Sequence, residues 1–138
     1  MGEYNLFISH AWKYHEDYYT VEDWLKAAKE NKELIYKNYS VPKHDPLIDP
    51  ESTVGKAQLK KMLKSQIRPS SAVIIISGMY ANYSEWIDFE IETAISMGKY
   101  IIGLKPWGQK HIPAKIQDNA DVMVGWNSES LIKAIKNS

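Results

Sequence analysis

The most constraining feature of the sequence is an unbroken run of small and β-branched apolar residues over 72–76, followed by Ser77. Such a run is typical of a central parallel strand that is covered on both faces. A second apolar run covers 100–104, and segments with helical spacing of apolar residues lie between the runs. Strands that alternate with helices imply right-handed crossovers and a parallel sheet.

The full pattern gives five strands, which we place at 4–9, 33–39, 72–77, 100–104 and 121–125. Four helices are expected between and after them. The first carries the apolar residues Val21, Trp24, Leu25 and Ala28, and the second Val54, Leu59, Met62, Leu63 and Ile67. The third covers Ser84–Met97, and the last carries Leu131, Ile132 and Ile135. Thr20 or Asp17 is the expected N-cap of the first helix, and Ser128 or Ser130 that of the last. Gly98 is a natural end for the third. We therefore predict one α/β domain over residues 1–138. Its expected form is a three-layer, flavodoxin-like, doubly wound parallel sheet in the order 2-1-3-4-5, with helices on both faces.

Composition limits the classes of function. The 138 residues contain no cysteine, so a disulfide framework or a cysteine nucleophile is excluded. The formal net charge is 0, which removes the simplest electrostatic case for a nucleic acid or an anionic membrane as partner. The N-terminus does not resemble a signal peptide, and apolar runs are far shorter than a membrane span. His15, His44 and His111 lack ligand spacing, so no metal site is expected. We expect a cytoplasmic protein.

Polar and aromatic residues follow the strands where a doubly wound sheet binds ligands. Ser9, His10 and Trp12 follow the first strand; Tyr80 and Asn82 follow the third. Ligands in such sheets lie beyond the carboxyl ends of the strands, at the point where strand order reverses. Flat apolar walls with a few polar groups are typical of a small-molecule cleft.

The third helix carries a carboxylate on its apolar side. At about 100° per residue, Glu90 falls inside an arc that includes Trp86, Ile87, Ile91, Ala94, Ile95 and Met97. Asp88, Glu92 and Ser96 fall on the opposite side. A core-facing carboxylate loses hydration unless it is paired or lines a cavity. Either Glu90 is structural, and pairs with a cation such as Arg68 or Lys105 or accepts backbone hydrogen bonds, or it is an acid at the floor of the cleft.

Several nucleotide and phosphate motifs are missing from the sequence. It contains neither G-x-G-x-x-G nor G-x-x-x-x-G-K-[ST], and no nucleophile elbow. A phospho-receiver needs an acidic cluster after the first strand and an aspartate after the third, but the residues there are Ser9-His10 and Ser77.

The segments 4–10 and 84–90 resemble two motifs of TIR domains. Residues 4–10 (YNLFISH) are similar to the opening strand of that family, and 84–90 (SEWIDFE) to its W-x-x-x-E helix. The short chain with Ser-His-Ala-Trp is most similar to stand-alone bacterial TIR-like proteins of the Thoeris anti-phage type. The segment 40–52 departs from the assembly loop of animal signalling TIR domains.

The resemblance implies an activity and a set of site residues. It implies an enzyme that cleaves the nicotinamide–ribose bond of NAD, with Glu90 as the catalytic residue, and makes an ADP-ribose-derived, cyclic signal nucleotide for a separate effector. Cyclisation, hydrolysis and transfer to another acceptor remain alternatives. NAD is then a consumed substrate, and no metal or dissociable cofactor is required.

The same resemblance assigns the cleft walls and the partners. Ser9, His10 and Trp12 would line the nicotinamide–ribose side, with Tyr80 and Asn82 opposite, and Trp86 would be a packing residue. Expected partners are NAD, the effector, a phage-derived trigger and further copies of this chain. The competing hypotheses are a non-catalytic TIR-like interaction module and a nucleotide sensor without chemistry.

Overall fold

The structure of the protein, a computed structural model, describes residues 3–9, 16–39, 53–77, 80–105 and 112–138. Strands and helices alternate along the chain. They follow in the order β1 (Tyr4–Ile8), α1 (Glu16–Glu30), β2 (Tyr36–Asn38), α2 (Thr53–Ile67), β3 (Ala72–Ile76), α3 (Tyr80–Ser96), β4 (Tyr100–Leu104), α4 (Ala114–Asn119), β5 (Val122–Val124) and α5 (Ser128–Lys136).

The sheet is parallel and has its strands in the order β2-β1-β3-β4-β5. This confirms the predicted order. The β3–β4 pairing runs from Ala72 opposite Tyr100 to Ile76 opposite Leu104. All five residues of β3 are buried, as a strand covered on both faces must be. The apolar run over 72–76 therefore forms the centre of the core.

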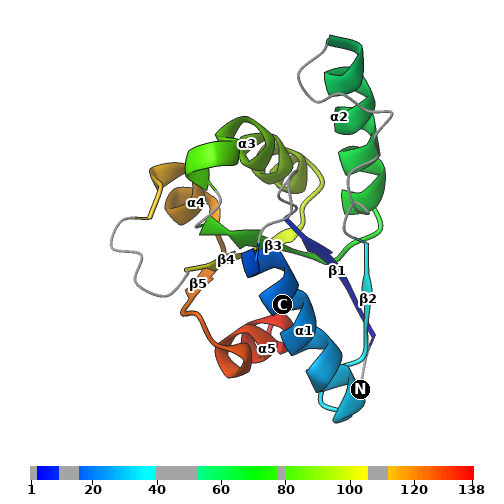
Figure 1. The fold of residues 1–138 in the computed structure, drawn as a ribbon, viewed down its shortest axis with the longest axis vertical. Helices are drawn as coiled ribbons and strands as arrows, with labels where there is room; N and C mark the ends of the chain where they lie inside the picture. The colour runs from blue at the N-terminus through cyan, green and yellow to red at the C-terminus, as the bar shows by residue number, and fades with distance from the viewer. Residues whose placement is uncertain (1–2, 10–15, 40–52, 78–79, 106–111) are drawn as a thin grey trace.

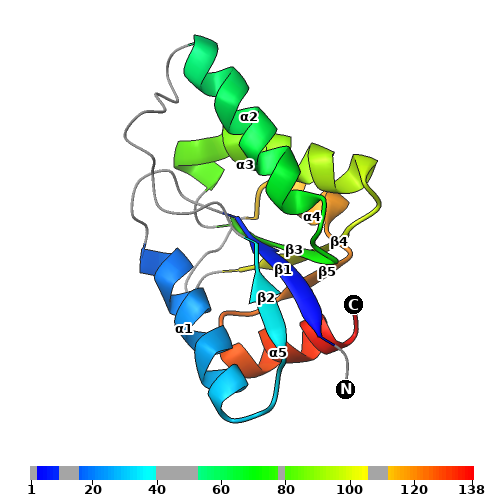
Figure 2. The same ribbon diagram turned by 90° about the vertical axis from the view of Figure 1, so that its right-hand side faces the viewer.

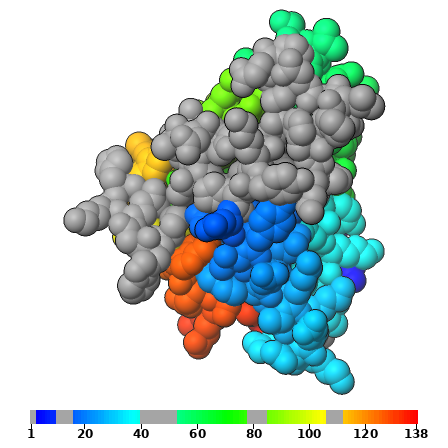
Figure 3. All heavy atoms as spheres, in the orientation of Figure 1, coloured from blue at the N-terminus to red at the C-terminus, as the bar shows by residue number. Residues whose placement is uncertain are grey.

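Helices cover both faces of the sheet and give three layers. α1 and α5 lie on one face, and α2, α3 and α4 lie on the other (Figures 1 and 2). The surface of α1 lies beside that of α5 in the space-filling view (Figure 3). Because all strands are parallel, their carboxyl ends lie at one edge of the sheet, where this class of fold binds ligands.

α3 is held on the outside by lysines of α2. The ammonium groups of Lys60 and Lys64 lie 5.6 and 5.8 Å from the centre of the Phe89 ring. Lys56 makes an ion pair with Glu85 at 3.3 Å. Exposed contacts of this kind contribute little energy individually, but three in a row fix how α3 lies against its neighbour.

Two predicted helix starts are wrong. α1 begins at Glu16, so Asp17 and Thr20 lie inside it; the Thr20 hydroxyl donates to the Glu16 carbonyl at 3.1 Å. The N-cap of α5 is Asn127, whose side-chain oxygen accepts from the Ser130 amide at 2.8 Å. An amide side chain one residue earlier takes the role predicted for a serine, since Asn caps as well as Ser does.

Other boundaries differ in length. α3 begins at Tyr80, four residues before the predicted Ser84, and β2 keeps only Tyr36–Asn38 of the predicted 33–39. α4 was not predicted, because six residues are too few to show a helical period. Gly98 follows α3 with φ +68°, the left-handed conformation that glycine adopts without strain and that ends the helix as predicted.

Two apolar residues predicted for buried helix faces are exposed. Val54 is 69% exposed because it lies about 140° and 180° around α2 from the buried Leu59 and Leu63, on the opposite side of the helix. Ile95 is 50% exposed and lies at the border of the apolar arc in the last turn of α3. Among the described residues, every helix is too short or too polar to span a bilayer.

Candidate functional site

The candidate site begins with two serines that follow the central strands. Ser9 comes directly after β1 and Ser77 directly after β3, and both are buried. The Ser9 hydroxyl accepts from the Ile76 amide at 3.4 Å, and the Ser9 amide donates to the Ile74 carbonyl at 2.7 Å. Ser9 is thus fixed against the carboxyl end of β3.

α3 contributes the buried carboxylate predicted from its periodicity. Glu90 is 1% exposed, and Ile87, Ile91 and Ala94 on the same side of the helix are equally buried. Trp86 is partly buried and packs against the core. The apolar side of α3 thus carries Glu90 into the interior, between the helix and the strands beneath it.

Glu92, only two residues further along, has the opposite environment. Its side chain is 63% exposed and makes an ion pair with Lys115 of α4 at 3.0 Å. Two residues correspond to about 200° around a helix, so the two glutamates face opposite sides. α3 therefore holds a carboxylate that is held away from water and one that is hydrated.

The two cations predicted as structural partners of Glu90 do not take that role. Within the residues that the structure describes, neither Arg68 nor Lys105 makes an ion pair with it. Arg68 lies after α2, before β3 begins, and its backbone carbonyl accepts from Lys99 at 2.8 Å. It therefore lies toward the amino end of β3, at the opposite end of the strands from the predicted cleft.

The remaining predicted site residues are only partly placed. His10 and Trp12 lie outside the described residues. Tyr80 and Asn82 belong to the first turn of α3, directly after the Ser77 end of β3, and their side chains lie outside the description. The structure thus places Ser9 and the first turn of α3, which contains Tyr80 and Asn82, after the carboxyl ends of β1 and β3, and Glu90 follows further along the same helix.

One residue of this region was not assigned a role from the sequence. The Ser77 hydroxyl donates to the Leu104 carbonyl at 3.1 Å and so joins the end of β3 to the end of β4. The available signal was its position, because Ser77 follows β3 as Ser9 follows β1. Two serines therefore link three neighbouring strands where the candidate site begins.

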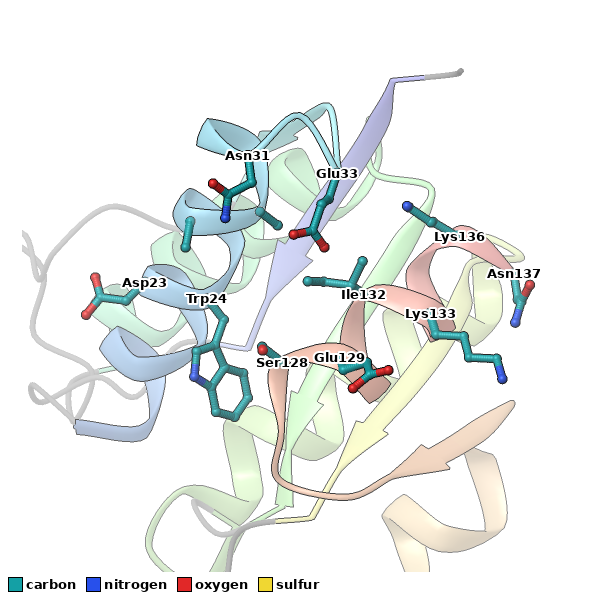
Figure 4. A pocket seen from close by; sticks show the side chains of 12 residues that line it. Asp23, Trp24, Asn31, Glu33, Ser128, Glu129, Ile132, Lys133, Lys136 and Asn137 are labelled. Carbon is teal, nitrogen blue, oxygen red and sulfur yellow. The ribbon is translucent and has the colours of Figure 1, made fainter.

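A hollow of about 730 Å³ lies on the other face of the sheet, between α1 and α5 (Figure 4). Trp24, Ile132 and two alanines form its apolar part, and Asp23, Glu33, Glu129, Lys133 and Lys136 are among its charged residues. Trp24 also packs against Trp126, with ring centres 4.8 Å apart. Of the predicted site residues whose side chains the structure describes, Ser9 and Glu90, neither lines this hollow.

Comparison with known families identifies a relationship over most of the chain. A model of the family described as Thoeris protein ThsB, TIR-like domain, matches residues 7–111. The matched segment runs from β1 to beyond β4 and contains Ser9, Ser77 and Glu90. No curated protein sequence matches the chain.

Solved structures share the fold at low sequence identity. A CMP N-glycosidase of Clostridium botulinum, BcmB, is 18% identical with a TM-score of 0.57, covering 97% of this chain and 99% of its own. A 2-deoxyribosyltransferase from Bacillus psychrosaccharolyticus is 13% identical with a TM-score of 0.65, covering 93% and 90%. A conserved protein from Enterococcus faecalis V583 is 11% identical with a TM-score of 0.64, covering 99% of both chains. At these identities the likeness concerns the fold.

Proposed function

The chain belongs to the family of Thoeris protein ThsB, TIR-like domains, and from this premise we propose that it is an NAD-consuming enzyme of anti-phage defence. In this proposal it cleaves the nicotinamide–ribose bond and makes an ADP-ribose-derived, cyclic signal nucleotide. The observation that carries the proposal is Glu90, a carboxylate buried to 1% exposure on α3, beside the strands whose ends form the candidate site.

The chemistry of the bond explains why one carboxylate is sufficient. Cleavage passes through an oxocarbenium-like centre at the ribose C1′, and a fixed negative charge nearby stabilises the positive charge that develops. Nicotinamide leaves as a neutral molecule, so a strong acid is not required. Glu90 would contact the ribose and stabilise the cation, and its low exposure strengthens that electrostatic interaction because little water screens it.

The walls of the site have separate roles in the proposal. Ser9, His10 and Trp12 line the nicotinamide–ribose side, with Ser9 as a fixed part of the wall through its bond to Ile76. Tyr80 and Asn82 form the opposite wall at the start of α3. NAD is consumed as the substrate, and the chemistry asks for no metal and no dissociable cofactor.

The fold of the solved structures supports glycosyl chemistry in general terms. One is a CMP N-glycosidase and another a 2-deoxyribosyltransferase used for nucleoside synthesis. Breaking an N-glycosidic bond is the same reaction class as releasing nicotinamide from NAD. The likeness supports this class of reaction and does not select NAD as the substrate.

The proposed partners follow from the family. They are NAD, an effector that the signal nucleotide activates, a phage-derived trigger and further copies of this chain. We propose that the protein acts in the cytoplasm, with neither nucleic acid nor membrane as a partner.

The proposal is tested by incubating purified protein with NAD, alone and with a lysate of phage-infected cells as the source of a trigger. Nucleotide chromatography should show free nicotinamide and an ADP-ribose-derived product in at least one condition. Hydrolysis leaves a free anomeric hydroxyl on the ribose that carried nicotinamide, and a cyclic product lacks it. The two products elute separately, so the same run distinguishes cyclisation from hydrolysis. Intact NAD in both conditions would contradict the proposal and favour the interaction module; NAD that binds but stays intact would favour the sensor.

A further inference from the structure

Two buried serines flank β3, and the hydroxyl of each donates a hydrogen bond to a backbone carbonyl. The two bonds differ in how far apart in sequence they join the chain. Ser77 follows the strand and Ser70 precedes it, and each is 1% exposed. The Ser70 hydroxyl donates to the Ile67 carbonyl three residues earlier, at 2.6 Å, within the end of α2. The Ser77 hydroxyl donates to the Leu104 carbonyl at 3.1 Å, on the neighbouring strand and 27 residues away in sequence.

The bond from Ser77 extends the pairing of β3 and β4 beyond its last residues. The regular pairing of the strands ends at Ile76 opposite Leu104. Ser77 then ties the next residue of the chain to the same Leu104. On the other side, the Ile76 amide donates to the Ser9 hydroxyl of β1. The carboxyl end of β3 is thus held from both neighbouring strands by side-chain hydrogen bonds.

This point of attachment lies directly before the helix that carries Glu90. α3 begins at Tyr80, three residues after Ser77. Only two residues separate Ser77 from Tyr80, so at about 3.8 Å between consecutive Cα atoms α3 must begin within about 11 Å of the end of β3. The Ser77–Leu104 bond holds the end of β3 from which the chain leads to α3.

We propose that Ser77 is a positioning residue for the reaction, acting through the connection to α3 on the place of the Glu90 carboxylate. The proposal rests on the proposed function. Ser77 needs no contact with NAD for this role, because it acts on the end of β3 that leads to α3. A displacement of a reacting group by about 1 Å lowers the rate by as much as 100-fold, while binding groups elsewhere on the substrate are unaffected. Loss of the hydroxyl should therefore lower kcat and leave KM almost unchanged.

Ser77→Ala and Ser70→Ala form a matched pair for the test. Each removes one buried hydroxyl that donates to a backbone carbonyl, so each should lower the melting temperature by only a few degrees. The measurement is nicotinamide release over a range of NAD concentrations, under the condition in which the unaltered protein is active. We expect Ser77→Ala to lower kcat by about 10-fold or more with KM within about threefold. Ser70→Ala should leave both within about twofold, because its bond lies at the amino end of β3.

Ser77→Thr retains the hydroxyl and should bring kcat back to within about threefold of the unaltered protein. If the alanine or threonine variant fails to fold, Ser77→Cys gives the second measurement, since it has nearly the same volume and a much weaker donor. The kcat of Ser77→Cys should fall by about 10-fold or more, as we expect for Ser77→Ala.

The outcomes separate this inference from the proposed function. An active unaltered protein with a normal kcat in Ser77→Ala or Ser77→Cys overturns the inference alone. The same holds if Ser70→Ala loses as much kcat as Ser77→Ala, or if KM rises while kcat is kept. An unaltered protein that releases no nicotinamide under any condition overturns the proposed function, and this inference falls with it.

Discussion

The two faces of the sheet differ in how they treat charged groups. Between α3 and the strands, Glu90 is almost fully buried. Between α1 and α5, a hollow of about 730 Å³ is lined by Asp23, Glu129, Lys133 and other charged residues. The charged side chains of the hollow keep their contact with water, whereas the Glu90 carboxylate is removed from it.

We therefore base the proposed chemistry on a carboxylate that is buried in an apolar layer and not on the size of a hollow. Mixed charges over a shallow apolar floor are common on protein surfaces and cost little free energy. A carboxylate inside an apolar layer costs stability, and proteins tolerate such costs mainly at functional sites. Substitutions on the side of α3 that faces the sheet should therefore lower the rate of nicotinamide release. Substitutions at the hollow should lower only the free energy of unfolding.

The largest expected effect is on activity at Glu90. Glu90→Asp keeps the charge but withdraws it by one methylene, so nicotinamide release should fall by about 100-fold or more. The matched control is Glu129→Asp at the hollow, for which we expect a change within about twofold. Comparable losses in the two variants would remove the distinction between the two faces.

The next largest effect is on stability, at the hollow. Trp24→Ala removes an indole that packs against Trp126 with ring centres 4.8 Å apart. We expect it to lower the free energy of unfolding by about 2–4 kcal/mol, measured by urea denaturation, because a large aromatic contact is lost. The rate of nicotinamide release by the folded variant should stay unchanged. A variant of normal stability that loses activity would assign a catalytic role to the hollow.

A smaller effect is expected at the cap of α5, beside the hollow. Asn127→Ala removes the acceptor of the Ser130 amide and should lower the free energy of unfolding by about 1 kcal/mol. Ser128→Ala tests the cap predicted from the sequence and should change it by less than about 0.5 kcal/mol. The reverse ranking would show that Ser128 caps the helix.

The smallest effect is expected for the exposed carboxylate of α3. Glu92→Gln breaks the ion pair with Lys115. The side chain of Glu92 is 63% exposed and that of Lys115 is 34% exposed. Exposed pairs contribute at most about 0.5–1 kcal/mol, and salt screens them. A loss of that size or less, which disappears at high ionic strength, is the expected result in thermal denaturation. A loss of several kcal/mol would show that the outer side of α3 is also energetically special.

Strand order and the buried carboxylate were predictable because each rests on a strong pattern. An unbroken β-branched run at 72–76 allows few alternatives to a central strand, and the alternation of elements fixes the topology. Glu90 was predictable because a helical period places it among Ile87, Ile91 and Ala94. Both features follow from the local sequence and from the requirement that apolar faces be buried.

The errors lie where tertiary structure overrides local pattern. Val54 was placed with Leu59 and Leu63, yet offsets of five and nine residues turn it about 140° and 180° away from them, and it is exposed. Asn127 and Ser128 are both good caps, and only the backbone conformation at Asn127 decides between them. The link from Ser77 to Leu104 joins residues 27 positions apart, so no periodicity could reveal it.

The most direct test of the account is nicotinamide release from NAD by Glu90→Gln, measured beside Glu92→Gln and the unaltered protein under the activating condition. Gln has nearly the same shape and keeps an oxygen for hydrogen bonding, so the fold should persist while the charge that stabilises the cation is lost. We expect nicotinamide release to be at least about 100-fold slower for Glu90→Gln and almost normal for Glu92→Gln. A folded Glu90→Gln variant that releases nicotinamide at the normal rate would contradict it.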